Sequence, residues 1–288
     1  MIRKIKSLRT GYVILLVSLI VVGCKQPAKV KEPVVNAAGQ TATVEVGIFN
    51  AVQLKDELVE TIRTGPKPKE MMEFLSQSGV AYMPQLTVPL GNVEKYMTSV
   101  DLTLANGMYR FDTYYAKVFN RQDVVVQTFD VFEKLATKQG QEAELAEFKL
   151  IQDKVKANVN NKDSLDAIIT DAINTYGGQI TQGLSGEKSG FYGLMYVGLN
   201  IEGMYILTQS ALMASDKKML IDFIGKQKER VEINYMVLEL LSANEEVAPV
   251  FEKMKPVLAV FQNNPQFTEK ELKEVATLIA DLRKNIVK

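Results

Sequence analysis

Apolar residues recur every three or four positions along almost the whole chain from Val44 onward. This spacing is typical of amphipathic helices, and the alternation at every second position that would indicate strands is hard to find. We therefore expect an all-α fold with no sheet. The clearest stripe lies within residues 92–119, where Arg110 and Asp112 fall away from the apolar side. The ten expected helices cover residues 45–64, 68–78, 92–119, 121–138, 142–158, 163–182, 187–214, 216–242, 246–262 and 269–286.

Short connections between long helices favour antiparallel neighbours. We therefore expect an irregular antiparallel helical bundle or array that forms a single domain, residues 44–288. Residues 79–91 contain two prolines and many apolar side chains, too many for a free loop, so we expect this segment to lie over the bundle and cap its core.

Two pairs of residues predict where helices begin. Thr268 with Glu271, and Ser242 with Glu245, have the spacing of a capping box. Pro256 falls inside an expected helix, which it should kink or divide.

The N-terminus carries an export signal. Four basic residues between positions 3 and 9 precede an apolar run at residues 12–22, which is about half the length of a membrane-spanning helix. The run ends at Val21-Val22-Gly23-Cys24, which resembles the bacterial lipobox, whose cysteine receives lipid and becomes the mature N-terminus. We expect residues 1–23 to be a lipoprotein signal peptide and Cys24 to be the lipid attachment site. The alternative is an ordinary cysteine in a signal peptide.

The residues after Cys24 indicate in which membrane the lipid is anchored and on which face the domain lies. Lys25 follows it, which by resemblance to enterobacterial sorting favours the outer membrane, and residues 24–43 have the composition of a flexible tether. We expect the domain on the periplasmic face, with surface exposure as the alternative. Without residues 1–23 the chain has a formal charge of −4, which argues against a nucleic-acid partner.

The composition excludes several kinds of chemistry. The chain has no His and one Cys, so His-dependent hydrolysis, most transition-metal sites and an internal disulfide are excluded. It also lacks a phosphate-binding glycine loop, a dinucleotide fingerprint and a GxSxG turn. We expect no cofactor, no metal site and no catalytic residue.

Glycines interrupt a strongly apolar segment at residues 186–214, which indicates close approach of a neighbouring helix or of a ligand. Glu202 within it should lie on an apolar face, where a carboxylate needs a cationic or hydrogen-bonding partner. With Tyr205 and Gln209 it would line a polar pocket; the alternative is a structural ion pair. Asn200 also interrupts the apolar run and is a further candidate for binding.

Aromatic residues cluster on more than one face of the helix expected at residues 92–119. Part of this cluster must be core, and the remainder, with Tyr109 and Tyr114 as candidates, would form an exposed binding patch. By contrast, residues 226–230 mix charge signs and indicate a solvent-facing surface.

Three segments, residues 107–112, 160–165 and 199–209, resemble an uncharacterised family of all-helical outer-membrane lipoproteins from anaerobic Gram-negative bacteria. The resemblance implies export, lipid anchoring and an all-α fold, and it brings no activity with it.

The sequence leaves three hypotheses about function. The first is a non-enzymatic lipoprotein, held at the membrane through Cys24, that binds an envelope protein, a peptide or a small ligand. The second is an envelope enzyme that acts on glycan or peptidoglycan with carboxylates. The third is a structural spacer, which predicts no concave pocket.

Overall fold

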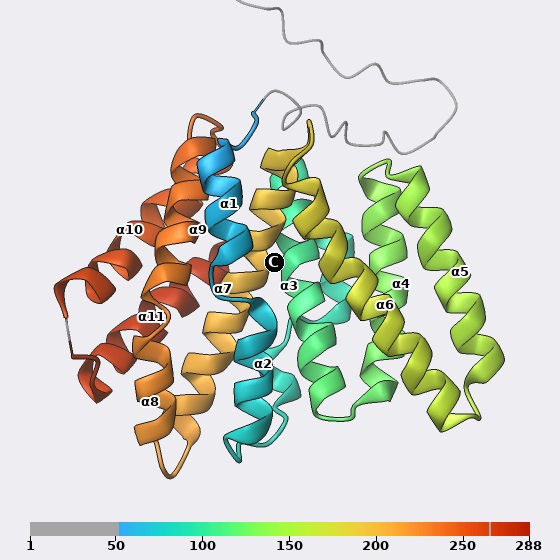
Figure 1. The fold of residues 1–288 in the computed structure, drawn as a ribbon, viewed down its shortest axis with the longest axis horizontal. Coiled ribbons are helices and arrows are strands. Elements are labelled where there is room, and N and C mark those ends of the chain that lie inside the picture. Colours follow the sequence, from blue (N-terminus) through green and yellow to red (C-terminus); the bar gives the residue numbers. More distant parts are fainter. Residues whose placement is uncertain (1–51, 265) are drawn as a thin grey trace, which may run out of the picture. The chain divides into compact units, whose positions relative to one another are not determined.

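The computed structural model describes residues 52–264 and 266–288, and their regular structure is entirely helical (Figure 1). This part of the chain has eleven α-helices and no strand, which confirms the all-α prediction. The predicted signal peptide, Cys24 and the tether lie outside the described residues. The α-helices are α1 (Asp56–Thr64), α2 (Pro68–Gln77), α3 (Ser99–Val118), α4 (Gln122–Lys138), α5 (Glu142–Asn158), α6 (Lys162–Gly183), α7 (Ser189–Met213), α8 (Lys218–Gly225), α9 (Lys228–Leu241), α10 (Ala248–Asn263) and α11 (Glu269–Ile286).

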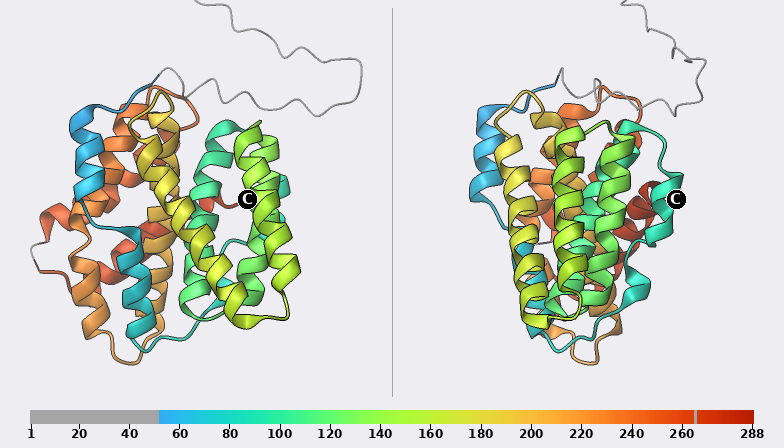
Figure 2. Two further views of the ribbon diagram at one scale, coloured as in Figure 1. Left: turned by 45° about the vertical axis from the view of Figure 1, so that its right-hand side comes forward. Right: turned by 90° about the vertical axis from the view of Figure 1, so that its right-hand side faces the viewer.

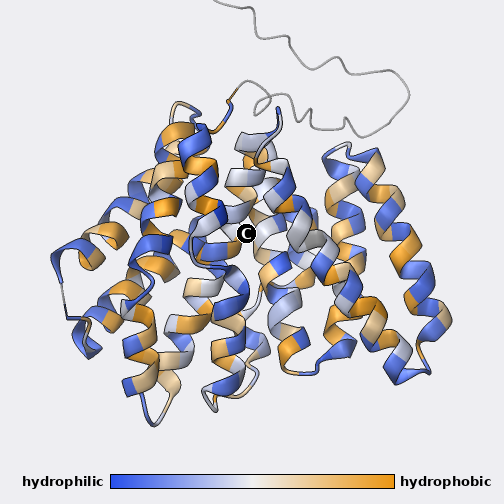
Figure 3. Cartoon of the chain, in the orientation of Figure 1, coloured by the Kyte–Doolittle hydropathy of each residue, from blue (hydrophilic) through white to orange (hydrophobic). Residues whose placement is uncertain are grey.

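Helices α3 and α7 pack side by side along the centre of the domain (Figure 1). On one side α4 packs on α3, and α4, α5 and α6 follow one another in order (Figure 2). On the other side α9, α10 and α11 form a second group, in which α9 and α11 contact α7. Figure 3 shows apolar and polar residues interspersed along most helices, as expected where one face is buried.

Three helices begin or divide differently from the prediction. The helix expected at 45–64 is wrong for residues 52–55, which are not helical, because α1 starts at Asp56. Thr98 caps α3, since its hydroxyl accepts a hydrogen bond from the Asp101 backbone N–H at 3.1 Å, so α3 starts at Ser99 and not at residue 92. The helix expected at 216–242 is two helices, α8 and α9. Gln227 separates them, because its amide donates to Phe223 O of α8 at 3.0 Å and accepts from Arg230 of α9 at 2.9 Å.

One expected capping box is confirmed and the other is wrong. Thr268 and Glu271 form a capping box at the start of α11. Ser242 instead ends α9, where its hydroxyl donates to Glu239 O at 2.7 Å, and α10 begins only after Val247.

Pro256 lies inside α10 and does not divide it, so of the two expected effects, a kink or a division, the division does not occur. Its ring lies on the exposed face of the helix, as does Glu252 one turn earlier. The carbonyl group that loses its helical donor to the proline is therefore on the side of the helix that faces water.

The glycines of α3 and α7 let the two backbones approach closely. A Cβ added at Gly107 would lie 2.0 Å from Met195 O and 2.7 Å from Leu199 N. A Cβ at Gly198 would lie 2.2 Å from Leu104 O. No side chain fits at these separations, so packing accounts for these glycines.

Residues 79–98, which we call the strap, cross the bundle between α2 and α3. The strap contains two 3₁₀ turns, η2 (Pro84–Leu86) and η3 (Leu90–Lys95), and buries Leu86 and Val88 in the core. This confirms that the segment at 79–91 covers the core. Its second half is held by Lys138, whose ammonium donates to Val93 O at 3.0 Å and to Tyr96 O at 3.2 Å.

Among the described residues, no helix combines the length and apolar character needed to span a bilayer.

The α3–α7 contact generates a prediction about stability. Gly107→Ala should lower the free energy of unfolding by about 3 kcal/mol or more, because the new methyl group meets backbone atoms that cannot move aside. Gly177→Ala is the matched control: Gly177 is exposed in α6 and an added Cβ meets nothing within 4 Å, so this variant should gain about 0.5–1 kcal/mol. Urea denaturation of both variants measures the difference, and equal stabilities would contradict the packing argument.

Candidate functional site

The structure divides the six predicted binding residues into two groups. Glu202, Asn200 and Tyr109 are fully buried and bonded within the protein, whereas Tyr205, Gln209 and Tyr114 are half-buried. The first group therefore offers little to a ligand in this conformation. Of the second group, Tyr205 lies against the guanidinium of Arg283.

Glu202 has the cationic partner that an apolar surrounding requires. Both of its carboxylate oxygens accept hydrogen bonds from Arg283 of α11, each at 2.7 Å. The Tyr205 ring lies 4.2 Å from the Arg283 guanidinium carbon, so it covers the cation from one side. The structure thus matches the alternative of a structural ion pair at Glu202.

A second carboxyl group, that of Asp112 on α3, lies beside this ion pair. Asp112 is 3% exposed, and its Oδ2 accepts a hydrogen bond from the Val88 backbone N–H at 2.8 Å. Its Oδ1 is buried and receives no hydrogen bond from another described residue. Asp112 and Arg110 lie off the main apolar stripe of α3, and both are nevertheless buried, because α3 is covered on nearly all sides.

Burial and mutual repulsion govern the protonation of this pair. Burial, and next the proximity of Glu202, raise the pKa of Asp112 well above its usual value. Burial also raises the pKa of Glu202, but the hydrogen bonds from Arg283 oppose that rise. A direct interaction between the two carboxyls raises the pKa of Asp112 and lowers that of Glu202. The two carboxyls thus differ in their surroundings: Arg283 favours the charged form of Glu202, whereas burial and the neighbouring Glu202 disfavour the charged form of Asp112.

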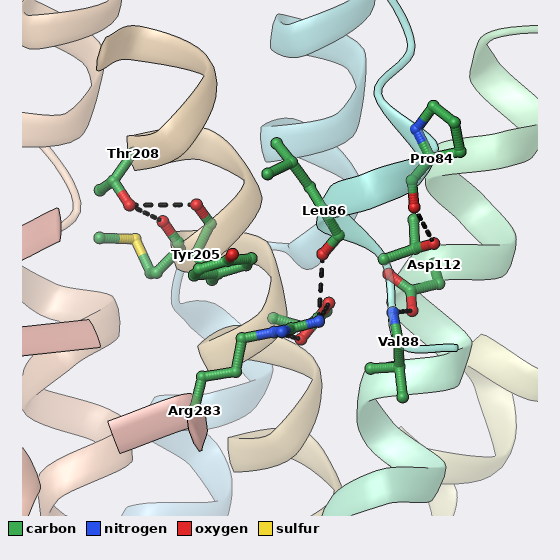
Figure 4. Close-up of polar contacts among 10 residues, drawn as sticks. Pro84, Leu86, Val88, Asp112, Tyr205, Thr208 and Arg283 are labelled. Carbon is green, nitrogen blue, oxygen red and sulfur yellow. Dashed lines mark hydrogen bonds and ion pairs between the residues drawn. The ribbon is translucent and has the colours of Figure 1, made fainter. Parts of the chain in front are cut away.

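These side chains also hold the main chain of the strap (Figure 4). Arg283 donates to Leu86 O at 3.0 Å, and Asp112 accepts from Val88 N. Tyr109, one turn before Asp112, donates from its hydroxyl to Pro89 O at 2.9 Å. The candidate site thus joins α3, α7 and α11 to the strap, and we call Asp112, Glu202 and Arg283 the latch.

Asn200 belongs to a separate buried network around Arg230 of α9. Its side-chain oxygen accepts from Arg230 at 3.0 Å, and its amide donates to Asn234 at 2.9 Å. Arg230 is fully buried, and among the described residues no carboxylate lies within ion-pair distance of it. The prediction that residues 226–230 form a solvent-facing surface is therefore wrong for Gln227 and Arg230.

The surface of the described domain also contains an open depression between α2 and α8. Its volume is about 350 Å³, and its aromatic part is a stacked pair, Phe74 and Phe223, with ring centroids 3.8 Å apart. The lining of the depression also includes Lys218, Met219 and Asp222. None of the six predicted binding residues lines this depression, so sequence reasoning did not find it.

Chemically, the latch places the carboxyl group of Asp112, whose pKa is raised, next to the carboxyl group of Glu202, which Arg283 pairs. A raised-pKa acid of this kind is a typical general acid, but here the strap covers it and Arg283 occupies its neighbour. No group of three or more His, Cys, Asp or Glu side chains within residues 52–264 and 266–288 is placed to hold a metal ion.

Comparison with protein-family models, with curated proteins and with solved structures finds no match for this chain. The resemblance of residues 107–112, 160–165 and 199–209 to a lipoprotein family stays a prediction.

The ion pair generates a stability prediction. Glu202→Gln should lower the free energy of unfolding by about 3 kcal/mol, because it removes the carboxylate that accepts both hydrogen bonds from the Arg283 guanidinium in a buried position. Asp281→Asn, also on α11, breaks an exposed ion pair with Lys253 and should change stability by less than about 1 kcal/mol. Chemical denaturation compares the two. A Glu202→Gln variant as stable as Asp281→Asn would mean that the buried pair contributes no more than a surface one.

Proposed function

We propose that this chain is a lipoprotein of the outer membrane whose helical domain binds a partner protein, a peptide or a small ligand without catalysing a reaction. The observation that supports the proposal is the set of contacts made by the three side chains of the latch. Its two carboxyls and its guanidinium are all engaged with one another or with the main chain of the strap, so they hold the domain together and present no reactive group to a substrate.

Attachment to the membrane rests on the sequence. The lipobox-like Val21-Val22-Gly23-Cys24 follows a short apolar run, and lipid on Cys24 would anchor the chain because each buried methylene contributes about 0.8 kcal/mol. The flexible residues that follow would let the domain meet a partner in the envelope at a distance from the headgroups.

Recognition would use the polar and aromatic side chains that remain partly accessible. Gln209 and Tyr205 of α7 and Tyr114 of α3 are such residues, and so are Phe74 and Met219 at the depression between α2 and α8. An apolar depression with charged edges is a common form of binding site, and a purely structural spacer would not need one.

One observation favours a second candidate, a carboxylate-dependent enzyme acting on envelope glycan or peptidoglycan. The structure singles out one acid pair, Asp112 with Glu202, in which the pKa of Asp112 is strongly raised. For catalysis the strap would have to lift and Arg283 would have to release Glu202, so this hypothesis requires a conformation other than the one described.

Lipid anchoring predicts the behaviour of Cys24→Ala. The variant should move from the membrane fraction to the soluble fraction and lose the mass of the lipid, because no other anchor is proposed. Lys25→Ala is the matched control and should stay acylated and membrane-bound. Fractionation and intact mass measure both; a Cys24→Ala protein that remains in the membrane fraction would contradict the assignment.

A second experiment separates binding from catalysis. The mature chain is incubated with envelope extract and examined by native mass spectrometry, alongside Asp112→Asn, which keeps the size of the side chain and its acceptor for Val88 N. We expect a discrete added mass on both proteins, because the latch acts only inside the fold. Turnover of peptidoglycan that has a bell-shaped pH profile and is lost in Asp112→Asn would favour the enzyme.

A further inference from the structure

The two halves of the strap are attached by different chemistry. The second half is held by Lys138, and by Asn92, whose amide donates to Lys288 O at 2.7 Å. The first half, residues 80–89, buries Leu86 and Val88 in the core. Its hydrogen bonds to the bundle include those with the latch and with the hydroxyls of Tyr109 and Tyr115, the latter accepting from Met83 N at 3.0 Å. The first half begins after Gly79, which has φ +77° and open space around it.

The latch has more acid than base. Two carboxyl groups face one guanidinium, and Asp112 Oδ1 has no hydrogen-bond donor among the other described residues, so the arrangement is balanced only while one carboxyl keeps its proton. The titratable groups that act on the pair come from every element packed against it: Tyr82 and Tyr96 of the strap, Tyr109 and Tyr115 of α3, and Arg283 of α11 with Tyr205 of α7 stacked on it.

Among these groups Asp112 is the acid whose ionisation the packing opposes, because burial and the neighbouring Glu202 raise its pKa. Burial raises the pKa of Tyr82 to about 12 and those of Tyr96 and Tyr109 further, so the phenols stay neutral where a carboxyl group ionises. Arg283 stays cationic throughout.

We propose that the first half of the strap is a releasable cover whose closure depends on the proton held between Asp112 and Glu202. When that proton leaves, two carboxylates share one guanidinium directly beneath Leu86 and Val88, and residues 80–89 open from Gly79 while the second half stays attached. Opening would uncover the face of α3 that carries Tyr109 and Tyr115, so the domain would present a different surface at high pH from the one at low pH.

The direction of the effect follows from linkage. Closing the strap raises the pKa of Asp112, so closure is fully favoured below the ordinary pKa of an aspartate and is weakened as pH rises toward the raised value. The closing equilibrium should fall about tenfold for each pH unit within that interval.

Hydrogen exchange on the whole chain in detergent tests this inference. Protection factors, corrected for the intrinsic effect of pH, are measured from about pH 5 to about pH 9 for the amides of Leu86 and Val88, of Leu102, whose acceptor Thr98 O lies in the second half, and of Ile201 in α7. We expect protection of Leu86 and Val88 to fall by about tenfold or more over this range, while Leu102 and Ile201 keep theirs.

Two variants sharpen the test. Asp112→Asn, which cannot lose a proton, should show no pH-dependent loss of strap protection. Tyr115→Phe removes the acceptor for Met83 N and should lower strap protection by the same factor at every pH, because it leaves the carboxyl pair intact. The infrared carbonyl band of a buried protonated carboxyl should disappear over the same pH interval in the unaltered protein. The inference is overturned if strap protection is independent of pH, if Asp112→Asn shows the same loss, or if Ile201 loses protection together with the strap.

Discussion

The close approach of α3 and α7 is the constraint on which the rest of the domain depends. Gly107 and Gly198 allow the two backbones to touch, and each helix carries a carboxyl group one turn or slightly more beyond its glycine. Asp112 and Glu202 are therefore brought together by the same packing that forms the core. Because two carboxyls at this depth need a cation, Arg283 of α11 lies against Glu202, and Arg283 and Asp112 each hold the main chain of the strap.

Much of the fold can be predicted from the local spacing of apolar residues. Periodicity predicted the helices because most of them have one buried face, and the apolar residues of the strap predicted that it covers the core. The need of Glu202 for a partner was also evident from its apolar neighbours. The identity of that partner was not, since Arg283 lies 81 residues away and a basic residue in the last turn of a helix is ordinary.

The residues that sequence reasoning missed lie where periodicity gives no information. In α3 nearly every side chain is buried, so Asp112, although off the main apolar stripe, faces another helix and not water. Arg230 stands among exposed Lys and Glu residues, and only the fold shows that its guanidinium turns inward to the Asn200 network. The break between α8 and α9 was missed for the same reason. The side chain of Gln227 bonds to both helices there, and only the fold shows these two hydrogen bonds.

The central position of α7 has a consequence for the order in which the domain can fold. Helices α2, α3, α6, α8, α9 and α11 all pack against it, and three of these precede it in the chain. During synthesis α3 is made long before the helix that covers its glycine face, so the first half of the chain must wait, with apolar surface exposed, until Met213 has emerged. We therefore expect a fragment that ends before α7 to aggregate, because the helices that pack against α7 would lack their common partner.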